Sequence, residues 1–234
     1  MFIGVTTVTW HRLDFGTSTD LIESFVSLVE QQAEDSVHKY KVEKKKGLPE
    51  VEVGDDEQGP YGQLVETYGG LDSMTWSFED VFEVYFPSLQ RRSALLTVCG
   101  FFEHELHKLC ILFQDERKLT LEPNALRGQG IEQSTDYLKK VIGLALDKKS
   151  QEWKAVTRVR EIRNIIMHRD GRPRDAQGEV LPDYRDALKN LQYLNSEGEE
   201  IVLEKGFVSQ AVGIFKSYFK LIDNSIQENE TDRK

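Results

Sequence analysis

A long apolar stripe dominates the sequence and defines its longest predicted helix, from Pro87 to Phe113. Apolar residues recur there every three or four positions, the period at which side chains share one face of an α-helix. Pro87 suits the first turn of such a helix, because the N–H that proline lacks would have no partner there. We expect Arg91 and Arg92 on the wetter side. The stripe consists of Leu95, Val98, Cys99, Phe102, Leu106, Leu109 and Phe113.

Further segments with the same period predict the helices that pack against this stripe. One of them opens with Asp20 and Glu23, which are spaced as a capping pair. The expected main helices are 20–40, 131–146, 151–172 and 207–226, and shorter ones are expected at 77–85 and 184–194. The sequence therefore predicts an all-α fold: a helical bundle of four to five main helices in a single domain, 1–234.

The segments outside the helices are expected to be accessory. Residues 1–16 are interpreted as an N-terminal arm. Residues 41–75, rich in charge and glycine, are predicted to be a polar insertion on the surface with a short extended piece. Residues 196–203 could form a small β-hairpin, and the polar tail 227–234 is expected to be frayed.

Composition limits the class of protein. Hydrophobic residues make up 39% and charged residues 30% of the chain, as in soluble globular proteins. No apolar run approaches the roughly 18 residues of a membrane span, so no membrane partner is expected. Cys99 and Cys110 both fall within an apolar helical pattern, which argues against a disulfide framework. The first residues do not have the pattern of a signal peptide, and a cytoplasmic location fits best.

The charge is unevenly distributed along the chain. The net charge of −10 argues against general coating of nucleic acid. Residues 148–174 nevertheless hold nine Lys or Arg against three Asp or Glu, a local charge of +6, which leaves −16 for the rest. A basic island on an acidic body is compatible with a focused phosphate site, and equally with chance clustering on a solvated face.

The predicted helix 151–172 carries the most suggestive polar residues. Asn164 and His168 are four apart and share one face, whereas Arg163 lies about 140° round the helix from His168. Histidine exchanges protons near neutral pH, and arginine presents a planar, permanently charged fork to phosphate oxygens. Such a pair could deprotonate the 2′-hydroxyl of RNA and stabilise the crowded phosphorane without a metal. The bland alternative is a helix that packs and happens to display these residues.

A metal site is the alternative suggested by Glu103-His104-Glu105-Leu106-His107. A zincin needs two histidines four positions apart, and these two are three apart. No third histidine or cysteine is obvious, so we expect no metal and no other cofactor.

The motif and its surroundings resemble the HEPN superfamily, the higher eukaryotes and prokaryotes nucleotide-binding domain. Its mark is R-N-x-x-x-H, and this chain has Arg163-Asn164-Ile165-Ile166-Met167-His168. The runs GIEQSTDYLKKVIGL and VREIRNIIMHRDG, and FPSLQRRSALLTVCGFFEHELHKLC before them, resemble helices of bacterial members. The resemblance covers roughly 78–226, and leaves out the arm and the polar insertion.

The resemblance implies an all-α bundle that forms a homodimer and brings two motif helices together. Catalytic members of the family are metal-independent endoribonucleases with a composite site across that interface. Arg163 and His168 would then be the catalytic pair, with Asn164 as a positioning residue. Arg160, Arg169 and Arg172 are predicted to support RNA binding through phosphate.

The biological role implied by the resemblance is that of a toxin or a phage-defence effector that cuts RNA, such as tRNA, with an antitoxin or defence protein as partner. Asp170 departs from the R-x-x-x-x-H-x-Y form, because it stands where those toxins have tyrosine. Regulation by modification of that tyrosine is therefore not expected here. The alternative is a non-catalytic HEPN-like dimeric adaptor or regulatory subunit of a defence complex.

Overall fold

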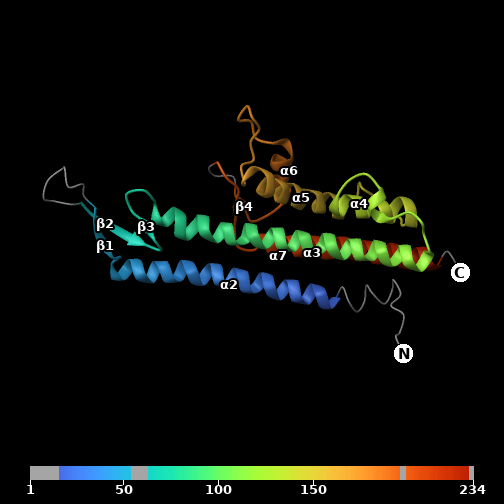
Figure 1. Cartoon of the computed structure of the whole chain (residues 1–234), viewed down its shortest axis with the longest axis horizontal. Coiled ribbons are helices and arrows are strands. Elements are labelled where there is room, and N and C mark those ends of the chain that lie inside the picture. The colour runs from blue at the N-terminus through green and yellow to red at the C-terminus, as the bar shows by residue number, and fades with distance from the viewer. Residues whose placement is uncertain (1–15, 54–62, 196–198, 232–234) are drawn as a thin grey trace.

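The computed structural model describes residues 16–53, 63–195 and 199–231, and within them the chain is mainly helical. Three long helices run side by side along the molecule (Figure 1): α2 (Gly16–Lys46), α3 (Phe86–Arg117) and α7 (Phe207–Thr231). Helices α3 and α7 lie between α2 on one side and α5 (Gln151–Arg169) on the other. The predicted helical bundle is confirmed at this level. No described helix is long and apolar enough to cross a membrane.

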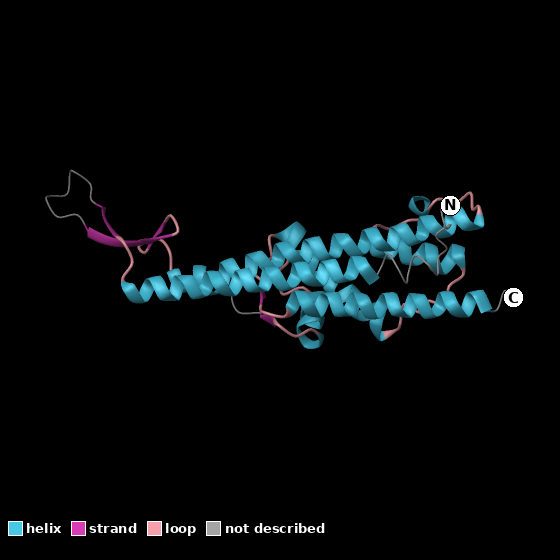
Figure 2. Cartoon of the chain, turned by 90° about the horizontal axis from the view of Figure 1, so that it is seen from below, coloured by secondary structure: helices cyan, strands magenta, loops and turns pink. Residues whose placement is uncertain are grey.

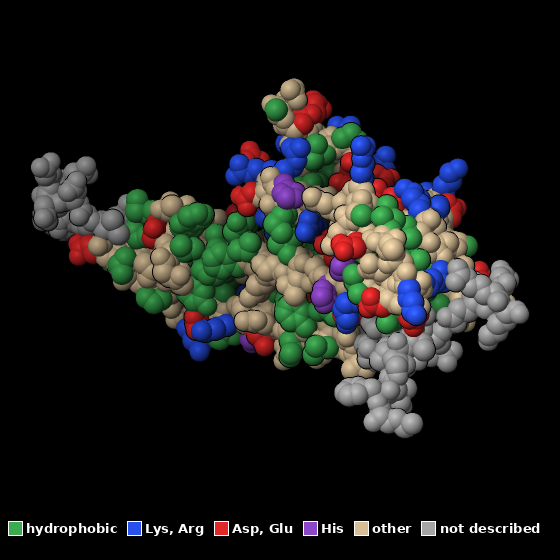
Figure 3. Space-filling view, turned by 45° about the vertical axis from the view of Figure 1, so that its right-hand side comes forward, with side chains coloured by type: hydrophobic (Ala, Val, Ile, Leu, Met, Phe, Trp, Pro, Cys, Tyr) green, Lys and Arg blue, Asp and Glu red, His purple; other side chains and the backbone are tan. Residues whose placement is uncertain are grey.

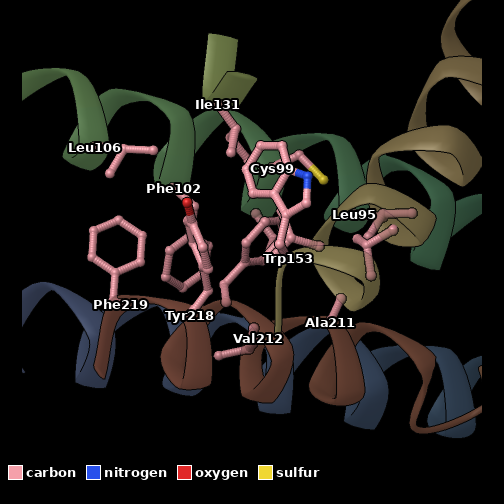
Figure 4. Close-up of a cluster of buried hydrophobic side chains, with 14 of the residues drawn as sticks. Leu95, Cys99, Phe102, Leu106, Ile131, Trp153, Ala211, Val212, Tyr218 and Phe219 are labelled. Carbon is pink, nitrogen blue, oxygen red and sulfur yellow. The ribbon is translucent and has the colours of Figure 1, made fainter. Parts of the chain in front are cut away.

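The core lies where α3, α5 and α7 meet (Figure 4). Phe102 of α3 stacks on Phe215 of α7, with ring centres 4.6 Å apart. Trp153 of α5 packs on Tyr218 of α7 at 5.5 Å. The apolar stripe predicted for 87–113 is buried along its whole length, so the periodicity identified the core face correctly.

The sequence predicted that a new helix begins at Pro87. Pro87 does lie in the first turn of α3, but no break separates α3 from the helical residues before it. Helical backbone runs without a break from Phe78 through the π-helix η2 (Asp80–Tyr85) into α3. The Phe86 N–H bonds to the Val81 carbonyl, the i→i−5 pattern of a π turn. This wider turn comes just before the position at which proline cannot supply a backbone donor, and lets the helix continue.

The described residues of the polar insertion, 41–53 and 63–75, include the end of a helix and a small sheet, which corrects the prediction of a surface loop with only a short extended piece. Helix α2 continues to Lys46. Strands β1 (Glu50–Val53), β2 (Gln63–Tyr68) and β3 (Leu71–Asp72) then form an antiparallel sheet in the order β1-β2-β3. The sheet stands beyond one end of the bundle (Figure 2).

Aromatic packing explains why this insertion folds. Tyr40, Leu48 and Phe78 form a second buried cluster, against which Tyr68 and Phe82 pack. The Tyr68 and Phe82 rings are 4.7 Å apart in an edge arrangement. Tyr40 belongs to α2, whereas Phe78 and Phe82 precede α3, so no local sequence pattern could reveal the cluster.

The C-terminal half of the chain differs from the prediction mainly in the boundaries of its helices. Helix α4 (Gly130–Tyr137) passes into the π-helix η4 (Leu138–Ile142) and ends at Gly143, which has a φ of 84°. A short 3-10 helix, η3 (Pro123–Ala125), precedes α4, and α6 (Pro182–Asn190) follows α5.

The small hairpin is present as β4 (Leu194–Asn195) paired antiparallel with β5 (Val202–Leu203). Its tip, 196–198, and nearly all of the predicted arm lie outside the described residues. The predicted frayed tail is wrong up to Thr231, because α7 continues to that residue. Asn229 donates to the Gly143 carbonyl and accepts from Arg117, and these bonds fix the last turns of the helix.

Arg91 and Arg92 are buried, although the sequence pattern placed them on the wetter side of their helix. Arg91 Nε donates to Glu30 of α2 at 2.9 Å. Arg92 pairs with Glu200 at 3.0 Å and also donates to the Ile201 carbonyl. Both charges are therefore neutralised by partners distant in sequence, which makes their burial tolerable.

Candidate functional site

Helix α5 is delimited by clear local signals. The Ser150 hydroxyl accepts from the Trp153 N–H at 3.1 Å, a side-chain N-cap. At the other end Asp170 and Gly171 have φ of 54° and 75°, and both backbone N–H groups bond to the Ile165 carbonyl. Helix α5 thus ends one residue after His168, three residues before the predicted end at Arg172.

One face of α5 packs into the core. The buried residues of this helix are Trp153, Val156, Val159, Ile162 and Ile165. This orientation leaves Arg163, Asn164 and His168 at or near the surface.

The three motif residues line one pocket of about 340 Å³ within a single chain. Arg163 Nη1 donates to Asn164 Oδ1 at 3.1 Å. The helical angle between Arg163 and His168 therefore does not separate their side chains, because the arginine is long enough to reach the same space. The rest of the lining consists of Glu103, Gln129, Gly130, Glu132 and Arg160.

Only one of the three predicted RNA-binding arginines lies at this pocket. Arg160 lines it, but its Nη1 is 2.9 Å from a Glu132 oxygen and its Nη2 is 3.5 Å from Glu161. Arg169 is exposed and donates to the Arg174 carbonyl, and Arg172 is exposed beyond the end of α5. The structure thus does not bring the three guanidinium groups together.

Much of the basic island is paired with acids from neighbouring helices. Lys148 lies 2.5 Å from Asp136 of α4, and Arg158 lies 2.6 Å from Asp186 of α6. Partial burial acts to raise the pKa of Asp136, but hydrogen bonds from Lys148 and Lys140 outweigh it and lower that pKa. The local excess of positive charge in the sequence is therefore reduced in the folded chain.

Two ionisable side chains of the pocket lining have no partner among the described residues. The His168 imidazole and the Glu103 carboxylate make no hydrogen bond or ion pair with the described residues. In addition, the Nε atoms of Arg160 and Arg163 are buried without an acceptor in the described part of the chain. An exposed imidazole beside an incompletely satisfied guanidinium can exchange a proton and hold an anion in one place.

Sequence reasoning missed the wall of the pocket that faces α5. Glu103 had been weighed only as part of a metal motif on its own helix. Within the described residues no group of three or more His, Cys, Asp or Glu is placed to hold a metal ion. Gln129, Gly130 and Glu132 belong to the start of α4, whose contact with α5 is a tertiary feature that no local motif reports.

Cys99 and Cys110 are both buried, and neither forms a disulfide. Burial raises the pKa of each thiol to about 12, so both stay protonated at neutral pH. Neither cysteine lines the pocket.

Comparison with known proteins adds no assignment. No family model matches the chain, and neither the curated proteins nor the solved structures contain a significant match to it.

Proposed function

We propose that this chain is a metal-independent endoribonuclease of the HEPN type, in which Arg163, Asn164 and His168 act on RNA. The observation that carries the proposal is that these three side chains line one solvent-open pocket, in which the His168 imidazole has no partner among the residues that the structure describes. The resemblance of the R-N-x-x-x-H motif supports the same reaction class.

The chemistry follows from the three side chains. His168 accepts the proton of a ribose 2′-hydroxyl, and the oxygen attacks the adjacent phosphorus. Arg163 stabilises the charge on the phosphorane oxygens, while Asn164 holds the guanidinium by accepting its Nη1–H. The bond from phosphorus to the 5′-oxygen breaks, and this oxygen takes up a proton. The products are a 2′,3′-cyclic phosphate and a 5′-hydroxyl end.

The product ends give the first test. Purified protein incubated with total RNA in EDTA should yield fragments that carry 2′,3′-cyclic phosphate and 5′-hydroxyl ends. End-specific ligation distinguishes these from 3′-hydroxyl and 5′-phosphate ends. RNA that stays intact, or fragments with the second kind of end, would contradict the proposed reaction.

A homodimer is part of the proposal, and the first half of α3 supplies a suitable surface. Between Glu83 and Glu103 the only charged residues are Arg91 and Arg92, and both are buried. The exposed side of this stretch is therefore uncharged, in a chain of which 30% is charged. Its exposed residues are Val84, Tyr85, Phe86, Leu89, Ser93, Thr97 and Gly100.

Hydrophobic side chains gather between the sheet end and the middle of the molecule (Figure 3). Exposed patches of this kind mark interaction surfaces. The uncharged surface ends at Glu103, which lines the pocket, so a second copy packed on it would bring a second motif helix close to the first. The second His168 could then protonate the leaving 5′-oxygen.

A non-catalytic adaptor is the second candidate, favoured by the two carboxylates at the pocket. Glu132 already forms an ion pair with Arg160, and Glu103 adds negative charge where phosphate would bind. An adaptor would leave total RNA intact and would show no growth inhibition that depends on His168. The proposed nuclease would inhibit growth on expression, in keeping with a toxin or phage-defence role, and His168→Ala would relieve the inhibition.

A further inference from the structure

The Glu103 carboxylate is an unexplained group in the pocket. It projects from α3, shares the pocket with Arg163 and His168, and has no hydrogen-bond or ion-pair partner among the described residues. Glu132, the other carboxylate of the lining, is bound to Arg160 and lies 3.7 Å from Lys148. Of these two carboxylates, Glu103 is the one whose oxygens are available to a ligand.

Glu103 and the motif residues enter the pocket from different helices. Glu103 comes from α3, and Arg163 and His168 come from α5. The pocket lining therefore combines an anionic group from one helix with a cationic group from another. The charges of Glu103 and Arg163 also act in opposite directions on the pKa of the buried Cys99 thiol, which burial raises to about 12.

Gly130 leaves room for the Glu103 carboxylate beside the start of α4. At the start of α4 it has a φ of 57°, and a Cβ built on it would lie 2.8 Å from Glu103 Oε1 and 2.9 Å from the carboxyl carbon. Any larger residue would be strained by its backbone and would push the carboxylate away. The carboxylate therefore rests against the bare backbone at the start of α4.

The Glu103 carboxylate determines which ligand groups this side of the pocket can bind. An ionised carboxylate only accepts hydrogen bonds, and it repels phosphate. Two parallel donors suit its two oxygens best. Among the RNA bases, guanine alone presents two adjacent donors of fixed direction, N1–H and N2–H, on its Watson–Crick edge. Adenine and cytosine offer one amino group there, and uracil one ring N–H.

We propose that Glu103 binds the Watson–Crick edge of guanine at the cleaved position, so that the substrate class is single-stranded RNA with guanine beside the scissile phosphate. This rests on the proposed nuclease function. Single-stranded RNA exposes that edge for recognition, whereas a duplex buries it. The volume of about 340 Å³ falls at the lower end of the roughly 300–1,000 Å³ of small-ligand sites, which suits one nucleotide unit.

The test compares four short RNA oligonucleotides that differ only in the base at one central position. The wild-type chain in EDTA should cleave the guanine oligonucleotide on the order of tenfold faster than the adenine, cytosine and uracil ones. An oligonucleotide with inosine, which lacks the 2-amino group, should be cleaved at a rate closer to that of the adenine oligonucleotide. Glu103→Gln replaces one acceptor by a donor and should abolish the guanine preference.

Asp115→Asn is the matched control, because Asp115 lies on the same helix, is exposed and does not line the pocket. It should keep the guanine preference. Equal cleavage of all four oligonucleotides by the wild type, or an unchanged preference in a folded Glu103→Gln protein, overturns the inference and leaves the nuclease in place. If Glu103 only stabilises the start of α4, its replacement lowers Tm and all four rates together, and the ratio stays unchanged.

A binding measurement separates this inference from the nuclease function. The wild type should bind guanosine 3′-monophosphate on the order of tenfold more tightly than adenosine 3′-monophosphate in calorimetry, and Glu103→Gln should bind the two alike. Guanine-selective binding without RNA cleavage supports the base site and contradicts the nuclease. Equal binding of both nucleotides by the wild type overturns the base site.

Discussion

At the scale of single residues, the most constrained side chain near the site is Arg92. Its guanidinium pairs with Glu200 and donates to the Ile201 carbonyl, and the Ile201 N–H bonds to the Gly171 carbonyl. A Cβ on Gly171 would lie 2.7 Å from Arg92 Nη1, so glycine is required there. These contacts fix the chain just beyond His168.

Replacing Arg92 with alanine should therefore destabilise the protein and loosen the end of α5. Breaking a buried ion pair costs about 3–5 kcal/mol, and the partial exposure of Glu200 favours the lower end of that range. Urea denaturation measures the change in the free energy of unfolding. Arg127→Ala, at an exposed arginine, is the control and should change stability by less than about 0.5 kcal/mol. A similar small change for Arg92→Ala would show that the pair contributes nothing.

The sequence could select candidate site residues only where the signal was local, and their roles stay predictions. Arg163, Asn164 and His168 were selected from one short motif, and they line one pocket. Arg91 and Arg92 were misplaced, because a charged residue is expected in water unless a partner is known. The partner of Arg91 is Glu30, on another helix and far away in sequence. Glu103 was considered only as a metal ligand, because its neighbours across the pocket come from α4 and α5 and are distant in sequence.

At the scale of elements, helices were predictable and their ends less so. The apolar period identified α3 and α7, but α5 ends at Arg169, before the predicted end at Arg172. The π-helix before Pro87 was not foreseen, because proline is an equally good signal for the first turn of a new helix. Only a short extended piece was expected where the structure has strands β1 and β2, because aromatic residues that secure the sheet belong to α2 and to the segment before α3.

At the scale of the whole molecule, the uncharged surface of α3 sets the prediction for assembly. The wild type should sediment as a dimer, with twice the 26.9 kDa of one chain. In a two-fold interface both chains contribute the same patch, so Thr97→Glu would bury an unpaired carboxylate from each chain in an uncharged surface and should give monomers.

Leu28→Glu, at an exposed position of α2, is the control and should remain dimeric. Analytical ultracentrifugation at several concentrations measures all three proteins. A monomeric wild type, or a dimer unaffected by Thr97→Glu, would exclude this surface as the interface.

The central claim concerns the pocket at the end of α5, and one comparison tests it directly. Wild type, His168→Ala and His104→Ala are incubated with the same single-stranded RNA in EDTA, and cleavage rates are measured alongside Tm. His104 is an exposed histidine on α3 outside the pocket, so its replacement controls for the loss of an imidazole. We predict that His168→Ala abolishes cleavage with an unchanged Tm, while His104→Ala cleaves like the wild type. Full cleavage by a folded His168→Ala protein would contradict the account.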